Sequence, residues 1–154
     1  MFVRLAVEQD TSELLQLTEA GVKELMPRHA YSETRFKQTI QSYLDRGNPT
    51  LFVVEEDRKV IAFLMASLHT HWFLDGHFAS QDVIYVRPDK RGTRAAAMLV
   101  KRLTAWSDQL GVTEIIGGTE TSFQPERTVR FLKHFGFREL GFCLYREISN
   151  GKRA

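Results

Sequence analysis

Hydrophobic residues in the first half of the chain recur at spacings that predict one strand, two helices and a hairpin. Residues 2–7 alternate and include β-branched and aromatic side chains, which indicates a short strand. Helical spacing then predicts helices over 10–26 and 32–46, each followed by a proline or glycine stop signal. Strands over 51–55 and 60–69 are joined by a polar turn, so we expect an antiparallel hairpin.

The second half predicts two more helices between three strands. The strands are expected over 81–86, 114–119 and 138–148. An alanine-rich helix over 93–110 and a shorter helix over 126–135 separate them. The predicted order is βααβββαβαβ, which requires a mixed sheet with helices packed on it. The fold class is therefore α+β, in the form of an α/β sandwich.

Composition and length favour one ordinary domain. The chain has 154 residues, of which 43% are hydrophobic and 26% charged, and it has no internal repeat. We expect a single domain over 1–148 and a flexible tail over 149–154. No apolar run is long enough to span a bilayer or to form a secretion signal, and the single cysteine, Cys143, cannot form an intramolecular disulfide. A cytoplasmic protein without membrane partners is the expectation.

The charge pattern does not indicate a nucleic-acid partner. The net charge is +2, and the basic residues are dispersed apart from short clusters over 87–94 and 152–153. Nucleic-acid sites require a concentrated basic surface. The cluster over 87–94 therefore points to a smaller anionic ligand.

That cluster lies between a predicted strand and the alanine-rich helix. A helix N-terminus presents unpaired N–H groups and a partial positive charge, which together can bind phosphate. Small side chains over 95–97 would let a ligand approach, and Arg91 and Arg94 could add charge-assisted hydrogen bonds. An ordinary strand–loop–helix connection is the alternative. The segment matches neither the GxxxxGK[ST] loop nor the GxGxxG pattern, so nucleotide hydrolysis and nicotinamide chemistry are not supported.

The same segment resembles the coenzyme A signature of the GNAT N-acetyltransferase superfamily, Q/R-x-x-G-x-G/A. The sequence RGTRAA over 91–96 has arginine first and alanine last, but Arg94 replaces the middle glycine. Val86-x-Pro88 before it and the helix ending in Gly-Phe over 131–137 are also typical of the family. The stretch over 85–111 looks like GNAT proteins of phages and prophages.

The resemblance implies a GNAT fold over nearly the whole chain, with a mixed and mostly antiparallel sheet. It implies acetyl-CoA as cosubstrate, an amine acceptor, and a gap between the strands over 81–86 and 114–119 where the coenzyme enters. Tyr85 and Val86 would offer backbone groups to the pantetheine arm. A homodimer is a further expectation, because dimers are common in this fold. The residues implied to hold the pyrophosphate are Arg91, Gly92, Thr93, Arg94, Ala95 and Ala96.

Direct acetyl transfer needs a base for the amine, and Asp82 and Glu120 are the candidates. Asp82 is four residues before Val86, so regular alternation would place both side chains on one face of the strand. Glu120 follows the next predicted strand and would face the same gap. Either carboxylate can instead be an ordinary solvated group at a strand end.

The acid that protonates the leaving thiolate is less clearly indicated. Many family members have a tyrosine four residues before the glycine of the Gly-Phe motif, and this chain has Leu132 there. Tyr145 on the predicted last strand is the leading substitute, with Tyr85 and Tyr31 as others. Some transferases need no acid, because a thiolate is itself a competent leaving group.

Two alternatives come from other residues. His69 and His71 share one face of a predicted strand and, with His77, could ligate zinc, but no cysteine cluster or HExxH motif accompanies them. We therefore expect no metal site. The changes at Arg94 and Leu132 also allow a GNAT-fold module that binds the coenzyme without catalysis, as a sensor or interaction protein.

Overall fold

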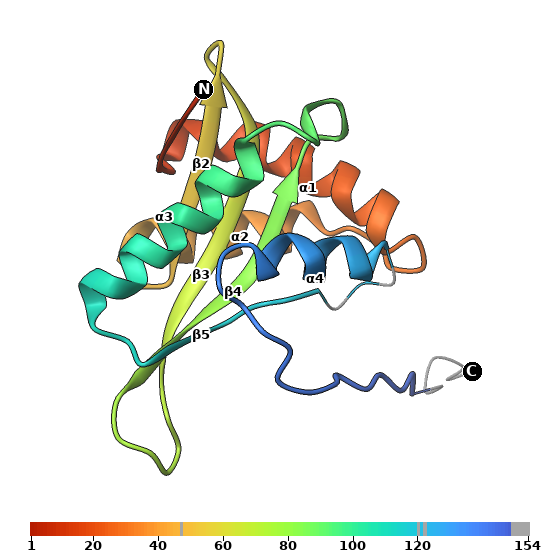
Figure 1. Ribbon diagram of the computed structural model, residues 1–154. Helices are drawn as coiled ribbons and strands as arrows, with labels where there is room; N and C mark the ends of the chain where they lie inside the picture. The colour runs from red at the N-terminus through yellow and green to blue at the C-terminus, as the bar shows by residue number, and fades with distance from the viewer. Residues whose placement is uncertain (47, 120, 122, 149–154) are drawn as a thin grey trace.

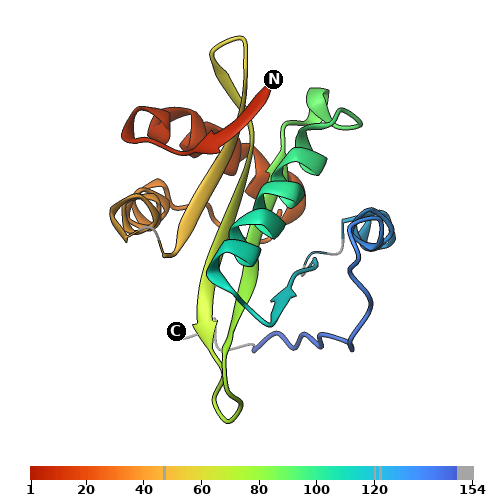
Figure 2. The same ribbon diagram turned by 60° about the vertical axis from the view of Figure 1, so that its left-hand side comes forward.

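The computed structural model describes residues 1–46, 48–119, 121 and 123–148, which form a five-stranded sheet with helices on both faces (Figures 1 and 2). The candidate base Glu120 and the predicted tail over 149–154 lie outside the described residues. The elements are β1 (Phe2–Leu5), α1 (Thr11–Leu25), α2 (Glu33–Arg46), β2 (Thr50–Glu56), β3 (Lys59–Thr70), β4 (His77–Val86), α3 (Ala95–Leu110), β5 (Glu114–Ile116) and α4 (Pro125–Lys133), with single 3₁₀ turns at Glu8–Asp10 and Pro88–Lys90.

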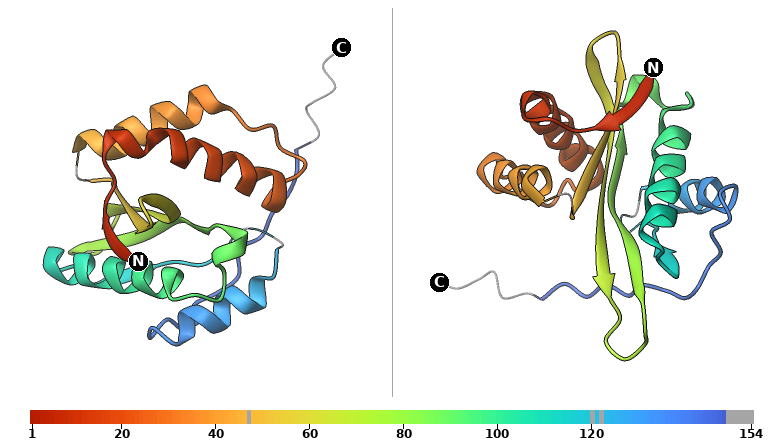
Figure 3. Two further views of the ribbon diagram at one scale, coloured as in Figure 1. Left: turned by 90° about the horizontal axis from the view of Figure 1, so that it is seen from above. Right: turned by 90° about the vertical axis from the view of Figure 1, so that its left-hand side faces the viewer.

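The strands follow one another in chain order across the sheet, β1-β2-β3-β4-β5. The first four pair antiparallel, and β5 pairs parallel to β4 because α3 carries the chain back between them. Helices α1 and α2 cover one face of the sheet, while α3 and α4 lie on the other side (Figure 3). The predicted α+β class and mixed, mostly antiparallel sheet are confirmed.

Two apolar layers hold the helices on the sheet, because alternate residues of a strand point to opposite faces. Phe63 of β3 lies between the sheet and the first two helices, and Leu64 points to α3. Residues 51–54 of β2 and 60–66 of β3 are buried on both faces of the sheet. This burial explains why the two segments form nearly continuous apolar runs.

Strand β4 contains a bulge at Asp82 that the sequence did not reveal. Met65 of β3 lies opposite Val83, while its neighbour Ala66 lies opposite Gln81, so Asp82 has no partner in the ladder. An extra residue reverses the alternation beyond it. The prediction that Asp82 shares a face with Val86 is therefore wrong.

The predicted strand over 138–148 is also wrong for a single copy of the chain. No backbone hydrogen bond joins these residues to any other described residue, and they have no regular secondary structure. Their apolar side chains are exposed, as is Cys143. Alternation favours a strand, but a strand requires a paired neighbour. The element order of the single copy therefore ends after α4.

Among the described residues, no helix has the length and apolar character needed to cross a membrane.

Candidate active site

Strands β4 and β5 separate partway along their length. They pair only where Phe78–Ser80 meets Glu114–Ile116, so residues 81–86 have no strand neighbour on that side within the described ranges. At the point of separation, Gln81 donates from Nε2 to the Gly118 carbonyl at 3.4 Å, while its buried Oε1 has no partner among the described residues. The separation leaves backbone groups of β4 available to a ligand.

Val86 directs its backbone toward this separation, whereas Tyr85 directs its backbone toward β3. The Arg87 N–H donates to the Ile61 carbonyl of β3 at 2.9 Å. Hydrogen bonding alternates along an antiparallel pair, so Tyr85 faces β3 as Arg87 does, and Val86 faces away. Of the two residues predicted to contact pantetheine, Val86 is therefore the one with a backbone donor on the open side.

The loop after β4 enters α3 through a conformation that requires one glycine. Gly92 has a φ of +83°, a region that strains residues with a Cβ. Arg94 has φ −74° and ψ 0°, which any L-residue adopts, so the absence of the second glycine costs the backbone nothing. Ala95 N–H donates to Thr93 Oγ1 at 3.3 Å. The first turn of α3 otherwise leaves N–H groups without helical acceptors, as an anion site requires.

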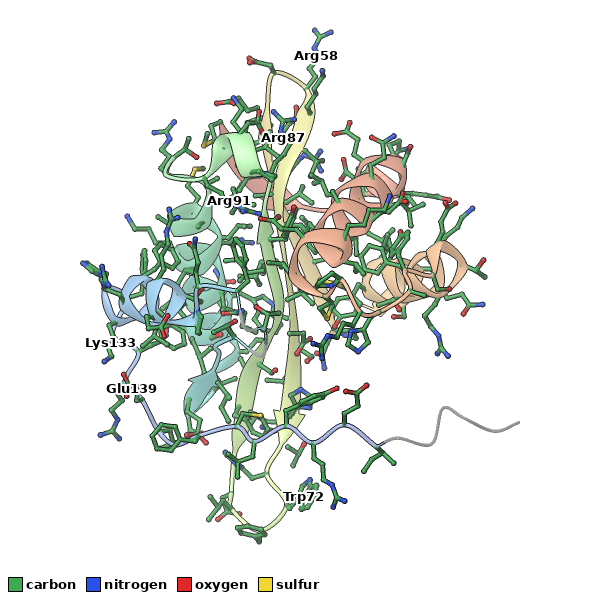
Figure 4. The ribbon with its side chains drawn as sticks, turned by 90° about the vertical axis from the view of Figure 1, so that its right-hand side faces the viewer. Arg58, Trp72, Arg87, Arg91, Lys133 and Glu139 are labelled. Atoms are coloured by element: carbon green, nitrogen blue, oxygen red, sulfur yellow. The ribbon has the colours of Figure 1, made fainter. Side chains whose placement is uncertain are left out.

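The Arg91 side chain is committed to another part of the fold (Figure 4). Its two terminal nitrogens donate to Glu24 of α1 at 2.5 and 2.7 Å, and its Nε donates to the Val86 carbonyl at 3.1 Å. The Tyr85 hydroxyl donates to the same carboxylate at 3.2 Å. Arg91 thus ties α1 to the end of β4, so its predicted contact with phosphate would have to come from its backbone.

Arg94 is the loop cation that remains available. Arg87 pairs with its neighbour Asp89 at 2.6 Å, and Lys90 pairs with Glu56 of β2. Arg94 is exposed at the start of α3 and pairs with no carboxylate within the described part of the chain. Its charge lies beside the free N–H groups of the helix.

The bidentate ion pair between Arg91 and Glu24 should make the free energy of unfolding depend on pH. Hydrogen bonds from Arg91 hold the pKa of Glu24 below its usual value of 4.5, despite the opposing effect of burial. A lowered pKa in the folded state stabilises the fold above the ordinary pKa, and this contribution is lost as pH falls through the folded value. We expect Glu24→Gln to lower the free energy of unfolding by about 1 kcal/mol at pH 7. The difference should shrink as pH falls below 4.5.

Urea unfolding of both proteins between pH 3 and 7 measures this dependence. Glu19→Gln is the matched control, because Glu19 pairs with Lys23 on the exposed side of α1 at 2.8 Å. That control should change stability little at any pH. A difference between wild type and Glu24→Gln that stayed constant down to pH 3 would contradict the assigned ion pair.

Three hydroxyl groups converge on the carboxylate of Asp82. Tyr43 of α2 donates to Oδ2 at 2.7 Å, Ser80 donates to Oδ1 at 2.7 Å, and Ser67 of β3 donates at 2.8 Å. Burial, followed by the nearby carboxylate, raises the pKa of the Tyr43 hydroxyl, which therefore stays protonated. The bulge and these donors hold an exposed carboxylate on the α1–α2 side of the sheet.

His69 extends this network. Its Nε2 lies 2.9 Å from Ser67 Oγ, and its ring stacks on Phe78 with centroids 5.1 Å apart. His71 instead lies 3.5 Å from Glu114 Oε1. Over the described ranges, no three histidine, cysteine, aspartate or glutamate side chains are grouped as metal ligands would be.

The candidate acids Tyr145 and Tyr31 make no hydrogen bond to Asp82 within the described part of the chain. Tyr145 is 80% exposed on the segment after α4, and Tyr31 donates to the Leu15 carbonyl at 3.2 Å. Leu132, which replaces the tyrosine common in the family, is buried.

Sequence reasoning missed several residues of the site because their partners are distant in the chain. Tyr43 falls on the apolar face of a helix, and Glu24 resembles any surface glutamate. Ser67 sits in an apolar strand with no motif around it. Only the three-dimensional contacts reveal their roles, which are with Asp82 for Tyr43 and Ser67, and with Arg91 for Glu24.

Comparisons with known proteins identify the class. A model described as the acetyltransferase (GNAT) family matches residues 14–137. The fold, with its separated β4 and β5 strands and the loop before α3, agrees with this match. The chain therefore belongs to the GNAT acetyltransferase family.

Similarity to an individual protein covers a smaller part of the chain than the family match does. An uncharacterised N-acetyltransferase of Schizosaccharomyces pombe is 36% identical over 55 residues, which cover 36% of this chain and 32% of the relative. This chain thus spans about a third of the length of that relative. Its name does not describe a phage protein, so the phage-like subgroup stays a prediction.

Two solved structures share the fold over nearly their whole length. Aminoglycoside 6'-N-acetyltransferase AAC(6')-IG from Acinetobacter haemolyticus has a TM-score of 0.76 and 22% identity, covering 97% of this chain and 99% of that one. A transcriptional regulator from Bacillus halodurans C-125 has a TM-score of 0.79 and 16% identity, covering 95% and 98%. At these identities the likeness concerns the fold.

Proposed function

We propose that this protein is an acetyl-CoA-dependent N-acetyltransferase that moves the acetyl group directly to a primary amine in a ternary complex. The observation that carries the proposal is that β4 bears two candidate sites, one for the coenzyme and one for a catalytic base. The strand ends in a loop suited to a pyrophosphate, and its bulge holds the Asp82 carboxylate against three hydroxyl donors. Membership of the GNAT family supports the same reading.

The proposed coenzyme site uses the backbone around Gly92 and the first turn of α3 for the pyrophosphate. The Arg94 side chain adds a charge-assisted contact that the usual glycine cannot make. Thr93 belongs to this loop, Ala95 and Ala96 begin α3, and the separation between β4 and β5 accepts the pantetheine arm. Arg91 contributes through its backbone and by tying α1 to the loop.

In the proposed reaction, the Asp82 carboxylate removes a proton from the acceptor amine, directly or through water. The amine nitrogen attacks the thioester carbonyl, whose oxygen accepts a hydrogen bond from the Val86 N–H. The new C–N bond forms, the C–S bond breaks, and coenzyme A leaves as a thiolate that takes a proton from solvent. Glu120 remains the second candidate base.

The alternative is a module that binds the coenzyme without catalysis. The similarity in fold to a protein described as a transcriptional regulator favours it, as does the exposed position of Tyr145. The two proposals differ in thiol release. With acetyl-CoA and a panel of aminoglycosides, small amines and peptides, an enzyme releases coenzyme A with at least one acceptor, whereas a module binds without turnover.

The contribution of Arg94 can be measured by calorimetric titration with acetyl-CoA. We expect Arg94→Ala to raise the dissociation constant about tenfold, because it removes a charge-assisted hydrogen bond to phosphate worth about 1.5 kcal/mol. Arg35→Ala is the matched control, since it removes the same charge from the exposed surface of α2. The control should bind as wild type does.

Equal affinities for all three proteins would show that Arg94 does not contact the ligand. An absence of binding by wild type at millimolar acetyl-CoA would contradict both the enzyme and the coenzyme-binding module.

A further inference from the structure

A cavity lies at the β1 edge of the sheet, on the opposite edge from the separation between β4 and β5. Strand β1 ends at Leu5, which pairs with Phe52, whereas β2 already begins at Thr50. The Ala6 N–H still donates to the Leu51 carbonyl at 2.8 Å, and the chain then leaves the sheet. The start of β2 that β1 leaves uncovered forms one wall of a cavity of about 170 Å³.

Helices from both faces of the sheet complete this edge cavity. Tyr43 and Leu44 of α2 line one side of it, and Arg102 and Trp106 of α3 line the other. Because α2 and α3 lie on opposite faces of the sheet, an occupant of the edge cavity would contact both layers (Figure 3). Most of the lining side chains are apolar, as is usual for sites that bind small molecules.

The volume of the edge cavity limits its occupant to about one ring. Sites for drug-sized ligands have volumes of about 300–1,000 Å³. An apolar cavity of about 150 Å³ in a protein core can hold one benzene molecule. At about 170 Å³, the edge cavity is therefore too small for a coenzyme or a nucleotide, but large enough for a single substituted ring.

Arg102 gives the edge cavity a positive charge. Its guanidinium carbon lies over the Phe52 ring, 5.2 Å from the ring centroid. Stacking of this kind leaves the N–H groups at the edge of the guanidinium available, and these can bind a carboxylate through two parallel hydrogen bonds. Within the described part of the chain, Arg102 forms no ion pair, and the residues that line the cavity include no acidic side chain. The charge therefore favours an anionic ligand.

We propose that the edge cavity binds a small aromatic carboxylate, with the ring against the apolar lining and the carboxylate paired with Arg102. Phe52 and Trp106 already pack edge to face, with ring centroids 6.3 Å apart, and a third ring would extend this cluster. Tyr43 lines the cavity while its hydroxyl donates to Asp82 at 2.7 Å. An occupant would thus touch a residue of the candidate active site without entering the coenzyme site.

Fluorescence titration with benzoate at constant ionic strength tests the proposal without any assay of acetyl transfer. The chain has two tryptophans, so a Trp72→Phe parent leaves Trp106 as the reporter. We expect a saturable change in its emission, with a dissociation constant in the millimolar range that suits so small a ligand. Arg102→Gln in this parent should weaken binding about tenfold or more, because it removes a charge-assisted pair. Lys101→Gln, at an exposed position of α3, should bind as the parent does.

Benzamide separates the effect of charge from the effect of shape. It has the ring of benzoate but no charge, so it should bind the parent at least about tenfold more weakly than benzoate does. It should also bind the parent and Arg102→Gln equally. Equal affinities of the parent for benzoate and benzamide would overturn the pairing with Arg102, and with it the proposal.

Amide NMR spectra of the isotope-labelled chain locate the bound benzoate. Amides over 5–6, 50–52 and 102–106 should shift with the same dissociation constant as the fluorescence. Amides over 92–96 report on the free N–H groups at the start of α3, which can hold any anion. Shifts that spare the cavity residues would overturn the proposal. A titration that does not saturate in the millimolar range, or equal binding of benzoate by parent and Arg102→Gln, would overturn it as well.

Discussion

We expect Asp82→Asn to lower kcat for acetyl transfer by a factor of about 10² to 10⁴, the range typical of a lost general base. The amide has the shape of the carboxylate and can still accept from Tyr43 and Ser67, so the network and the fold should persist. It cannot take a proton from the amine. Steady-state kinetics with the best acceptor, and calorimetric titration with acetyl-CoA, separate the loss of turnover from a loss of binding.

Two comparisons make this result decisive. Ser80→Ala removes one hydroxyl donor to Asp82 but keeps the carboxylate, so it should cost far less than Asp82→Asn. Glu120→Gln tests the other candidate base. If Asp82→Asn kept more than a tenth of wild-type kcat while Glu120→Gln lost it, the base would be Glu120. Unchanged acetyl-CoA affinity in all three variants would locate the effects in the chemical step.

The largest expected effect on stability is that of Phe63→Ala. Phe63 is 1% exposed and lies between Phe36 of α2 and Tyr85 of β4, with ring centroids 6.4 and 6.2 Å away. Truncation leaves a cavity beneath the helix that carries Tyr43. Such substitutions cost about 3–5 kcal/mol, so we expect a loss of this size in the free energy of unfolding from urea denaturation at one fixed protein concentration.

Phe73→Ala is the matched control, because Phe73 is 86% exposed at the tip of the β3–β4 hairpin. Its effect should stay within about 0.5 kcal/mol. A cost below about 1 kcal/mol for Phe63→Ala would mean that the α1–α2 layer can collapse into the space that the ring leaves.

Most of the fold could be predicted because its signals are local. The periodicity of the helices, their proline and glycine stop signals, and the polar turn of the β2–β3 hairpin lie within short windows of sequence. The bulge at Asp82 gives no such signal, since its one extra residue is visible only against the register of β3. The prediction of a strand over 138–148 was wrong for a related reason. Alternation of apolar residues does not reveal whether a neighbouring strand is present to pair with.

The candidate site also has features that the sequence could predict and features that it could not. The candidate loop over 91–96 could be proposed from a contiguous motif, and Gly92 within it has a φ of +83°, which favours glycine. The role of the Arg91 side chain could not, because Glu24 is 67 residues away and no pattern links the two. Asp82 could be proposed from the sequence as a carboxylate near the end of a strand. Its hydroxyl donors could not, because they come from three different elements.

The bulge in β4 also sets the distance along the strand between Asp82 and the loop that contains Gly92. Because β4 continues from Asp82 to Val86, where the loop that contains Gly92 begins, each residue of the strand moves that loop by about 3.3 Å. Deleting Asp82 would restore a regular ladder, but it would remove the carboxylate and draw the loop one residue closer to the hairpin. Catalytic groups tolerate displacements of only about 0.5 Å. A single irregular position therefore spaces the two halves of the site, and insertions or deletions in β4 should be far less tolerated than substitutions.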